Sequence, residues 1–214
     1  MNYKEWPIAR DGFIFIIPLL LITFLCFFAG FLRTGIFFSA PTLFVVWFFR
    51  NPERTTPKNE KAVVSPADGT VLKIEEVEED DLIKGSFMKV SVFMSIFNVH
   101  VNRLPCSGVV KAIRYEKGAF FSANLDKASK LNERNSVVVE TAGGREILTI
   151  QIAGLVARRI VCWVQEGMKA VKGERFGLIR FGSRLEVFLP PDTKILVKAG
   201  DKVKSGETEI GYLS

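Results

Sequence analysis

A run of 21 residues without a charged side chain, residues 12–32, constrains this chain more than any other feature of its sequence. At about 1.5 Å of rise per residue, a helix of this length extends about 31 Å, enough to cross the hydrocarbon core of a bilayer. A second uncharged run, residues 34–49, follows Arg33 and extends only about 24 Å as a helix. The sequence therefore predicts a membrane anchor over residues 1–50, in which one transmembrane helix precedes either a second, thinner crossing or a re-entrant segment.

Basic residues flank the two runs on their outer sides: Lys4, Arg10, Arg50, Arg54 and Lys58. Because positive charge is retained on the cytoplasmic side, this distribution favours a transmembrane helical hairpin with Arg33 at its outer turn. The alternative is a cleaved signal peptide, but its apolar region would be too long, and no small-residue cleavage site follows it. We expect the chain in the cell (inner) membrane, with the remainder of the protein in the cytoplasm.

The composition limits what that remainder can be. Residues 51–62 are polar, contain two prolines and predict a linker, which leaves residues 63–214 as one domain. From residue 59 onward, 23 Lys and Arg face 20 Asp and Glu, a balance that argues against a nucleic-acid partner. Three widely spaced cysteines and a single histidine, His100, exclude a disulfide framework and a multi-histidine metal site, so we expect no metal.

Short β-branched runs separated by Gly, Pro and Asp recur through the domain. We predict six strands, at residues 69–74, 88–93, 108–115, 136–140, 146–152 and 184–189. Residues 123–134 and the surroundings of residues 96–101 are expected to be helical or irregular. The predicted fold class is therefore mainly β, a sandwich or barrel-sandwich behind the helical hairpin.

Two segments resemble the turns of biotinyl- and lipoyl-type β-sandwiches: Ser65-Pro-Ala-Asp-Gly-Thr-Val and Val197-Lys-Ala-Gly-Asp-Lys-Val. They raise an alternative function, a membrane-tethered carrier or adaptor domain without enzymatic activity. Lys169 in Glu166-Gly-Met-Lys-Ala would carry the prosthetic group, but it lies too far along the chain from the Gly-Asp turn to form a compact carrier hairpin.

Four segments could carry chemistry. Asp68 occupies an Asp-Gly turn, and His100 lies among apolar residues. Residues 172–179 are punctuated by glycine, and a Gly182-Ser183 pair separates two apolar stretches. Each has an ordinary structural explanation by itself, since Asp-Gly and Gly-Ser are common turn and loop dipeptides. A function must therefore be argued from their combination.

In this order the segments resemble the phosphatidylserine decarboxylase family, in particular its short, single-domain bacterial and archaeal members. The similar motifs cover most of the chain: Phe48-Phe-Arg-Asn-Pro-Glu-Arg, Ser65-Pro-Ala-Asp-Gly, His100-Val-Asn-Arg-Leu-Pro-Cys-Ser-Gly, Lys117-Gly-Ala-Phe-Phe-Ser-Ala-Asn, Asn132-Glu-Arg-Asn, Gln151-Ile-Ala-Gly and Phe176-Gly-Leu-Ile-Arg-Phe-Gly-Ser.

The resemblance implies a proenzyme that makes its own cofactor. Ser183 would attack the carbonyl of Gly182 and convert the peptide bond into an ester. β-Elimination and hydrolysis would then leave a pyruvoyl group at the new N-terminus. The products would be a β fragment, residues 1–182, and an α fragment, residues 183–214.

The residue types agree with that chemistry. Glycine at position 182 offers an unhindered carbonyl and tolerates a strained backbone. A serine hydroxyl becomes a nucleophile only beside a base or in a distorted geometry. The keto carbonyl of a pyruvoyl group can condense with a primary amine and accept the electrons left when carbon dioxide departs. An enzyme with one histidine can therefore still decarboxylate an amino acid.

The chain departs from the family pattern at two positions. Bacterial relatives typically place a second histidine where Arg103 stands, and many have Thr where Arg184 stands. Because arginine stays protonated, Arg103 is a poor base. We expect His100 to serve both self-cleavage and decarboxylation, oriented by Asp68. Either arginine would then bind the carboxylate or phosphate of the substrate.

The resemblance also implies the partners. The substrate would be phosphatidylserine in the membrane, and the product would be phosphatidylethanolamine. The sequence leaves open whether the protein forms a homo-oligomer. We expect basic and aromatic residues to dock the domain on anionic lipid: Arg158, Arg159, Trp163, Phe120 and Phe121.

Overall fold

A computed structural model describes residues 6–122, 131–155, 159–180 and 182–214. The chain divides into two compact units, Met1–Glu53 and Arg54–Ser214. Most of the segment expected to be helical or irregular, residues 123–134, lies outside the described residues, as does Arg158.

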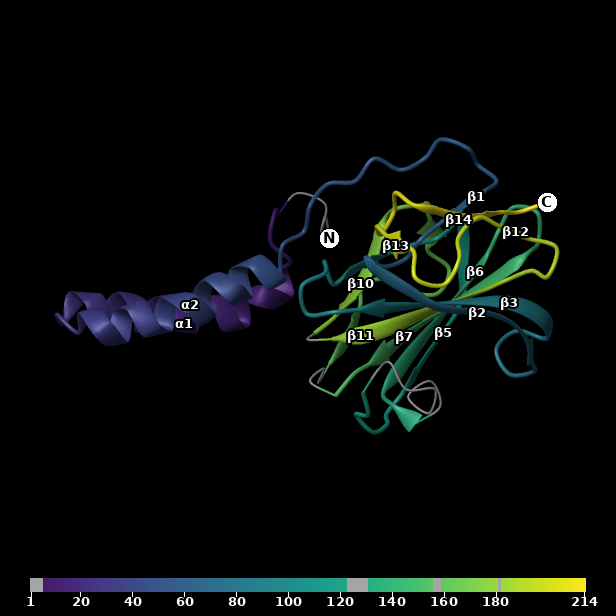
Figure 1. The fold of residues 1–214 in the computed structure, drawn as a ribbon. Coiled ribbons are helices and arrows are strands. Elements are labelled where there is room, and N and C mark those ends of the chain that lie inside the picture. Colours follow the sequence, from purple (N-terminus) through teal and green to yellow (C-terminus); the bar gives the residue numbers. More distant parts are fainter. Residues whose placement is uncertain (1–5, 123–130, 156–158, 181) are drawn as a thin grey trace. The chain divides into compact units, whose positions relative to one another are not determined.

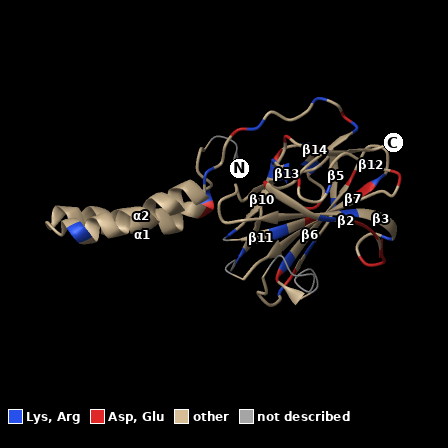
Figure 2. Cartoon of the chain, viewed as in Figure 1, with Lys and Arg blue, Asp and Glu red and all other residues tan. Residues whose placement is uncertain are grey.

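The first unit is a pair of helices. A short 3-10 turn, η2 (Arg10–Gly12), leads into α1 (Phe13–Phe28), and α2 (Leu32–Phe48) returns beside it (Figure 1). The hydroxyls of Thr23 and Thr42 lie 3.0 Å apart across the pair. A Cβ atom at Gly35 would come within 2.7 Å of the Phe27 ring, so the absence of a side chain at Gly35 permits this close packing. Figure 2 shows both helices almost free of charged residues.

One of these helices has the properties of a membrane span. The helical stretch Arg10–Phe28 comprises 19 residues and is apolar enough to cross a bilayer, whereas Leu32–Phe48 is shorter. Most large apolar side chains of α1 are exposed within the protein, as expected for a lipid-facing helix. The helical hairpin expected from the sequence is present as a packed pair; its second crossing stays a prediction.

The second unit is mostly β. Its strands are β1 (Ala62–Val64), β2 (Gly69–Glu79), β3 (Gly85–Met94), β4 (Val101–Arg103), β5 (Gly108–Glu116), β6 (Arg134–Glu140), β7 (Glu146–Ala153), β8 (Ile160–Cys162), β9 (Lys169–Ala170), β10 (Arg175–Ile179), β11 (Ser183–Leu189), β12 (Lys194–Ile195), β13 (Lys202–Val203) and β14 (Glu209–Tyr212). All six predicted strand segments lie within strands of the structure, namely β2, β3, β5, β6, β7 and β11.

The principal sheet is antiparallel and curled like a half-barrel, in the order β13-β2-β3-β11-β7-β6-β5-β9 (Figure 1). β11 runs through its middle, hydrogen-bonded to β3 on one side and to β7 on the other. Every residue of β11 is buried, including the polar residues Ser183, Arg184 and Glu186. Leu185, Val187 and Leu189 face the main core, and Phe188 packs in a second cluster on the opposite face.

Two smaller sheets, β4-β10-β8 and β1-β14-β12, complete the unit. The first lies against the principal sheet near Gln151. A Cβ atom at Gly177 in β10 would come within 2.3 Å of the Val161 carbonyl oxygen and 3.0 Å of the Gln151 amide nitrogen. Only glycine allows this approach, which brings β4 and its neighbouring His100 close to β7 and β11.

Of residues 51–62, expected to form a linker, residues 51–61 carry no helix or strand, whereas Ala62 begins β1. Their polar side chains nevertheless have defined contacts. The guanidinium of Arg54 binds both carboxylate oxygens of Asp68, at 2.9 and 3.1 Å, and also Glu207 at 3.3 Å. The end of this segment is therefore fixed to the β unit.

Candidate active site

The Gly182-Ser183 pair stands at the start of the central strand β11. Gly182 adopts φ +78°, a left-handed conformation that residues with a side chain rarely adopt. Ser183 pairs with Met94 on β3 and with Ala153 on β7, so the peptide group before it is held at the end of a central strand. Local backbone geometry thus sets this peptide apart from a regular strand.

The carbonyl group of Gly182 is polarised by a backbone donor. The N–H of Gly154, the residue after β7, donates to the Gly182 oxygen at 3.1 Å. A nucleophile that attacked this carbonyl carbon would place negative charge on the same oxygen. The Gly154 N–H therefore occupies the position of an oxyanion-stabilising donor.

His100 lies against the same residue. The Gly182 N–H donates to Nε2 of His100 at 3.3 Å, and Nδ1 lies 3.1 Å from the Asn98 carbonyl oxygen. Because a carbonyl oxygen can only accept, the proton belongs on Nδ1, and Nε2 carries the lone pair. The ring is only 1% exposed, and its basic nitrogen is directed at the N–H of Gly182, the residue before Ser183.

The hydroxyl of Ser183 is fully buried, and its Oγ donates to the sulfur of Met94 at 3.3 Å. A thioether is a weak acceptor, so this contact retains the proton only loosely. A rotation about the Cα–Cβ bond of Ser183 would exchange the sulfur for another acceptor.

A chain of buried side-chain amides ends at the same sulfur. Asn135 donates to Gln151 at 3.0 Å, and Gln151 donates to Asn102 at 2.8 Å. The amide nitrogen of Asn102 then points to Met94 Sδ at 3.6 Å. All three amides are at most 2% exposed. Their order fixes the Asn102 side chain with an amide N–H directed at the sulfur of Met94, which also accepts from Ser183 Oγ.

This arrangement fits a carbonyl group at position 183. The Ser183 hydroxyl and Asn102 Nδ2 both donate to the thioether of Met94, and a keto oxygen at position 183 would be a better acceptor than a thioether. Asn102 and His100 are therefore the residues that would hold a pyruvoyl group derived from Ser183.

The carboxylate of Asp68 is 8% exposed and is engaged by Arg54 and by the backbone N–H of Ser205, at 2.8 Å. The contact that orients the His100 ring at Nδ1 comes from Asn98. Asp68 thus joins the end of the 51–61 segment to the turn after β13.

The two candidate substrate-binding arginines are both buried and both engaged. Arg103 donates to the Gly173 carbonyl oxygen at 2.7 Å. Arg184 forms an ion pair with Glu186, whose partner Ser91 lies on β3. Because side chains alternate along a strand, Arg184 faces the side of the sheet opposite to Ser183.

Sequence reasoning missed the backbone donor of Gly154, the carbonyl of Asn98 and the amide chain. Backbone groups carry no side-chain signal. Of the three amides only Gln151 left one, because it interrupts the apolar end of β7; Asn102 and Asn135 stand beside other polar residues.

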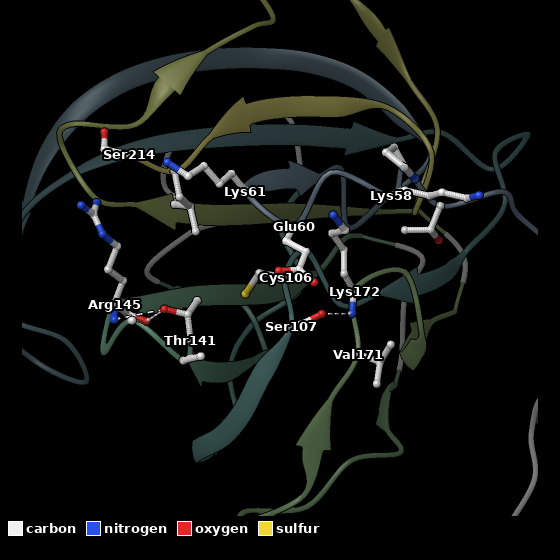
Figure 3. Close-up of a pocket in the computed structure, with 15 residues that line it drawn as sticks. Lys58, Glu60, Lys61, Cys106, Ser107, Thr141, Arg145, Val171, Lys172 and Ser214 are labelled. Carbon is white, nitrogen blue, oxygen red and sulfur yellow. Dashed lines mark hydrogen bonds between the residues drawn. The ribbon is translucent and has the colours of Figure 1, made fainter.

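A cavity of about 610 Å³ elsewhere in the unit holds none of these groups (Figure 3). Its lining includes the turn between β6 and β7, at the opposite end of those strands from Ala153, together with Lys172 and Cys106. Burial raises the pKa of the Cys106 thiol to about 12, so this sulfur is not a nucleophile at neutral pH. The candidate active site is therefore the start of β11.

Comparison with known proteins relates this chain to one family. The family model for phosphatidylserine decarboxylase matches residues 42–211. The chain is 58% identical over 207 residues to the phosphatidylserine decarboxylase proenzyme of Syntrophus aciditrophicus, covering 95% of this chain and 96% of the relative. It is 46% identical to the protein of the same name from Geobacter metallireducens, covering 100% of both chains.

Proposed function

The chain belongs to the phosphatidylserine decarboxylase family, and we propose that it removes the carboxyl group of phosphatidylserine, releasing CO2 and leaving phosphatidylethanolamine. The observation that carries the proposal is the hydrogen bonding of Gly182, whose oxygen accepts from Gly154 and whose N–H meets His100. The carrier alternative is not supported, because these relatives are named as decarboxylase proenzymes.

The proposed self-cleavage uses these contacts. Ser183 Oγ attacks the Gly182 carbonyl carbon while His100 Nε2 takes the hydroxyl proton, and the Gly154 N–H stabilises the oxyanion. The nitrogen of Ser183 leaves that carbon, which produces an ester. Loss of the Ser183 Cα proton then breaks the Cβ–Oγ bond and frees Gly182 as a carboxylate. Water replaces the nitrogen at position 183, and ammonia is released.

The pyruvoyl group so formed would supply a carbonyl that binds the substrate amine and withdraws electrons as CO2 leaves. Asn102 Nδ2 would orient it by a hydrogen bond. His100 would return a proton to the substrate carbon that lost CO2. The buried position of residue 183 excludes competing water.

The two fragments, 1–182 and 183–214, would stay together after cleavage. β11 keeps its hydrogen bonds to β3 and β7, and all seven of its side chains are buried. The apolar helix Arg10–Phe28 would anchor the β fragment in the cell membrane with the domain on the cytoplasmic side. Anchoring raises the local concentration of a lipid substrate.

The test uses the full chain reconstituted in vesicles that contain phosphatidylserine. We expect the wild type to convert it to phosphatidylethanolamine with stoichiometric CO2, and Ser183→Ala, which cannot form the pyruvoyl group, to produce neither. A wild-type chain that is cleaved but makes no phosphatidylethanolamine would refute the proposed substrate. Full activity of Ser183→Ala would refute the cofactor.

A further inference from the structure

The loops at one end of the principal sheet, where β11 starts with Ser183, expose apolar side chains. The strand register places the starts of β11 and β6 beside the ends of β3, β7 and β5, so the adjoining loops all open at this end. We name the large apolar side chains exposed there the apolar rim: Ile96, Phe97, Phe120, Leu131 and Leu155, at 38, 65, 37, 51 and 66% exposure.

The rim is built onto the active site. Ile96 contacts Gly182, where a Cβ atom would lie 3.9 Å from its methyl group. Leu155 follows Gly154, the donor to the Gly182 carbonyl. The turn that displays Phe97 is closed by Asn98, whose Oδ1 accepts from both the N–H and the hydroxyl of Ser95 at 2.9 Å.

The other two members are fixed through Asn132. Its amide donates to the Phe121 carbonyl oxygen at 2.8 Å and to the Ala153 carbonyl oxygen at 2.7 Å. This side chain ties the loop that carries Phe120, and the residue next to Leu131, to the end of β7. These hydrogen bonds hold the exposed apolar side chains in place. A contiguous exposed apolar patch is unfavourable in water and marks a site of interaction with a protein or a membrane.

The hairpin turns at the other end of the same strands differ. The β2–β3 connection, residues 80–84, contains Asp80, Asp81 and Lys84, and its Ile83 is buried. The β6–β7 turn, residues 141–145, is Thr-Ala-Gly-Gly-Arg. Exposed apolar loop tips thus gather at the catalytic end of these hairpins.

The charges around the rim are predominantly positive. Lys117, Arg159 and Arg180 lie on its loops. Three carboxylates that the structure describes nearby are engaged: Glu116 with Arg134 at 2.7 Å, Glu133 with the N–H of Ile160 at 3.1 Å, and Asp81 with Arg114. Apolar side chains surrounded by cations are suited to the interface of an anionic bilayer, where the former enter the acyl boundary and the latter meet phosphates.

We propose that the apolar rim inserts into the interface of a bilayer that contains anionic phospholipid, so that a lipid headgroup reaches Ser183 without leaving the membrane. The role in substrate delivery rests on the proposed function, whereas insertion itself does not. The proposal extends the expected docking residues, of which Phe120 and Arg159 lie at this end, to Phe97 and Leu155.

Insertion is tested by fluorescence in the full chain, reconstituted in vesicles with and without brominated lipids. Phe97→Trp places a reporter on the rim, and Val109→Trp places the control on β5, where Val109 is 48% exposed at the opposite end of the sheet. Trp6, Trp47 and Trp163 contribute equally to both variants. We expect brominated lipid to quench the added Phe97→Trp signal strongly and the Val109→Trp signal little. Equal quenching, or quenching of neither, as for a rim covered by a protein or a second copy, would overturn the proposal.

Substrate delivery is tested by kinetics on two forms of phosphatidylserine. Phe97→Asp should lower the rate on vesicles by about ten-fold or more, because it removes an apolar group that the bilayer would bury and adds repulsion from anionic lipid. Its rate on monomeric short-chain phosphatidylserine should match the wild type, and Val109→Asp should change neither. Equal loss on both substrates would contradict delivery from the membrane. No activity of the wild type on either would refute the proposed function and leave the fluorescence result standing.

Discussion

Among single residues, His100 matters most, because its imidazole contacts both Asn98 and Gly182. His100 has its proton fixed on Nδ1 by the carbonyl of Asn98, and its lone pair directed at Gly182. A backbone carbonyl thereby supplies the orientation that a carboxylate provides in a Ser-His-Asp arrangement. The side chain of Asn98 may vary without changing that contact, because the acceptor belongs to the main chain.

Replacement of His100 should block formation of the enzyme. We expect His100→Ala to slow self-cleavage by about 100-fold or more, since general-base catalysis contributes that much. Denaturing gels and intact-mass spectra of freshly purified protein measure the cleaved fraction. Complete cleavage of His100→Ala at the wild-type rate would show that another group is the base.

Replacement of Asn102 should separate formation of the group from its use. Asn102→Leu removes the donor beside residue 183 and leaves the Gln151 amide without its acceptor, which costs about 1–3 kcal/mol of stability. We expect the turnover number per cleaved chain to fall by about ten-fold to 100-fold, as for loss of one positioned donor. The cleaved fraction from intact mass normalises the rate, and an unchanged rate per cleaved chain would exclude the role given to Asn102.

The sequence singled out Gly182, Ser183 and His100, and the structure brings these three together. It could not locate the Gly154 donor, because any glycine has the same N–H. The orientation of Arg184 could be predicted from the sequence, since residues 184–189 were expected to form a strand and adjacent residues of a strand face opposite sides. Asp68 shows the reverse limitation: its partner Arg54 lies 14 residues away in a segment without periodic structure.

At the scale of elements, the long strands were predictable and the short ones were not. The six predicted segments have β-branched runs bounded by turn residues, which is the signal that local sequence carries. Strands of two or three residues, such as β4 and β8, arise because β10 supplies them with a partner in a small separate sheet. Their sequences contain too few residues to show a period of two.

The contact between Arg54 and Asp68 should stabilise the β unit. Arg54→Ala removes two charge-assisted hydrogen bonds to a carboxylate that is 8% exposed, and we expect a loss of about 2 kcal/mol in the free energy of unfolding. Thermal unfolding in detergent measures the change. Lys58→Ala, at an exposed position of the same segment, is the matched control; equal melting temperatures for the two variants would count against the contact.

At the scale of the whole molecule, two parts of the chain solve different problems. An apolar N-terminal helix is long enough to cross a bilayer, and a curled sheet holds Gly182, at a positive φ, next to a buried serine. A chain with a single histidine and no multi-histidine metal site can catalyse decarboxylation if it converts that serine into an electron sink. The uncharged run at the N-terminus and the Gly182-Ser183 pair together account for that division.

The most direct test is the mass of the chain itself. Intact-mass analysis of the purified wild type should show two fragments, residues 1–182 and a 32-residue fragment, 183–214, whose N-terminus resists Edman degradation and carries the mass of a pyruvoyl group. Ser183→Ala should remain a single chain of 214 residues. An active wild-type protein that stays uncleaved, or a 183–214 fragment that begins with an unmodified serine, would contradict the account.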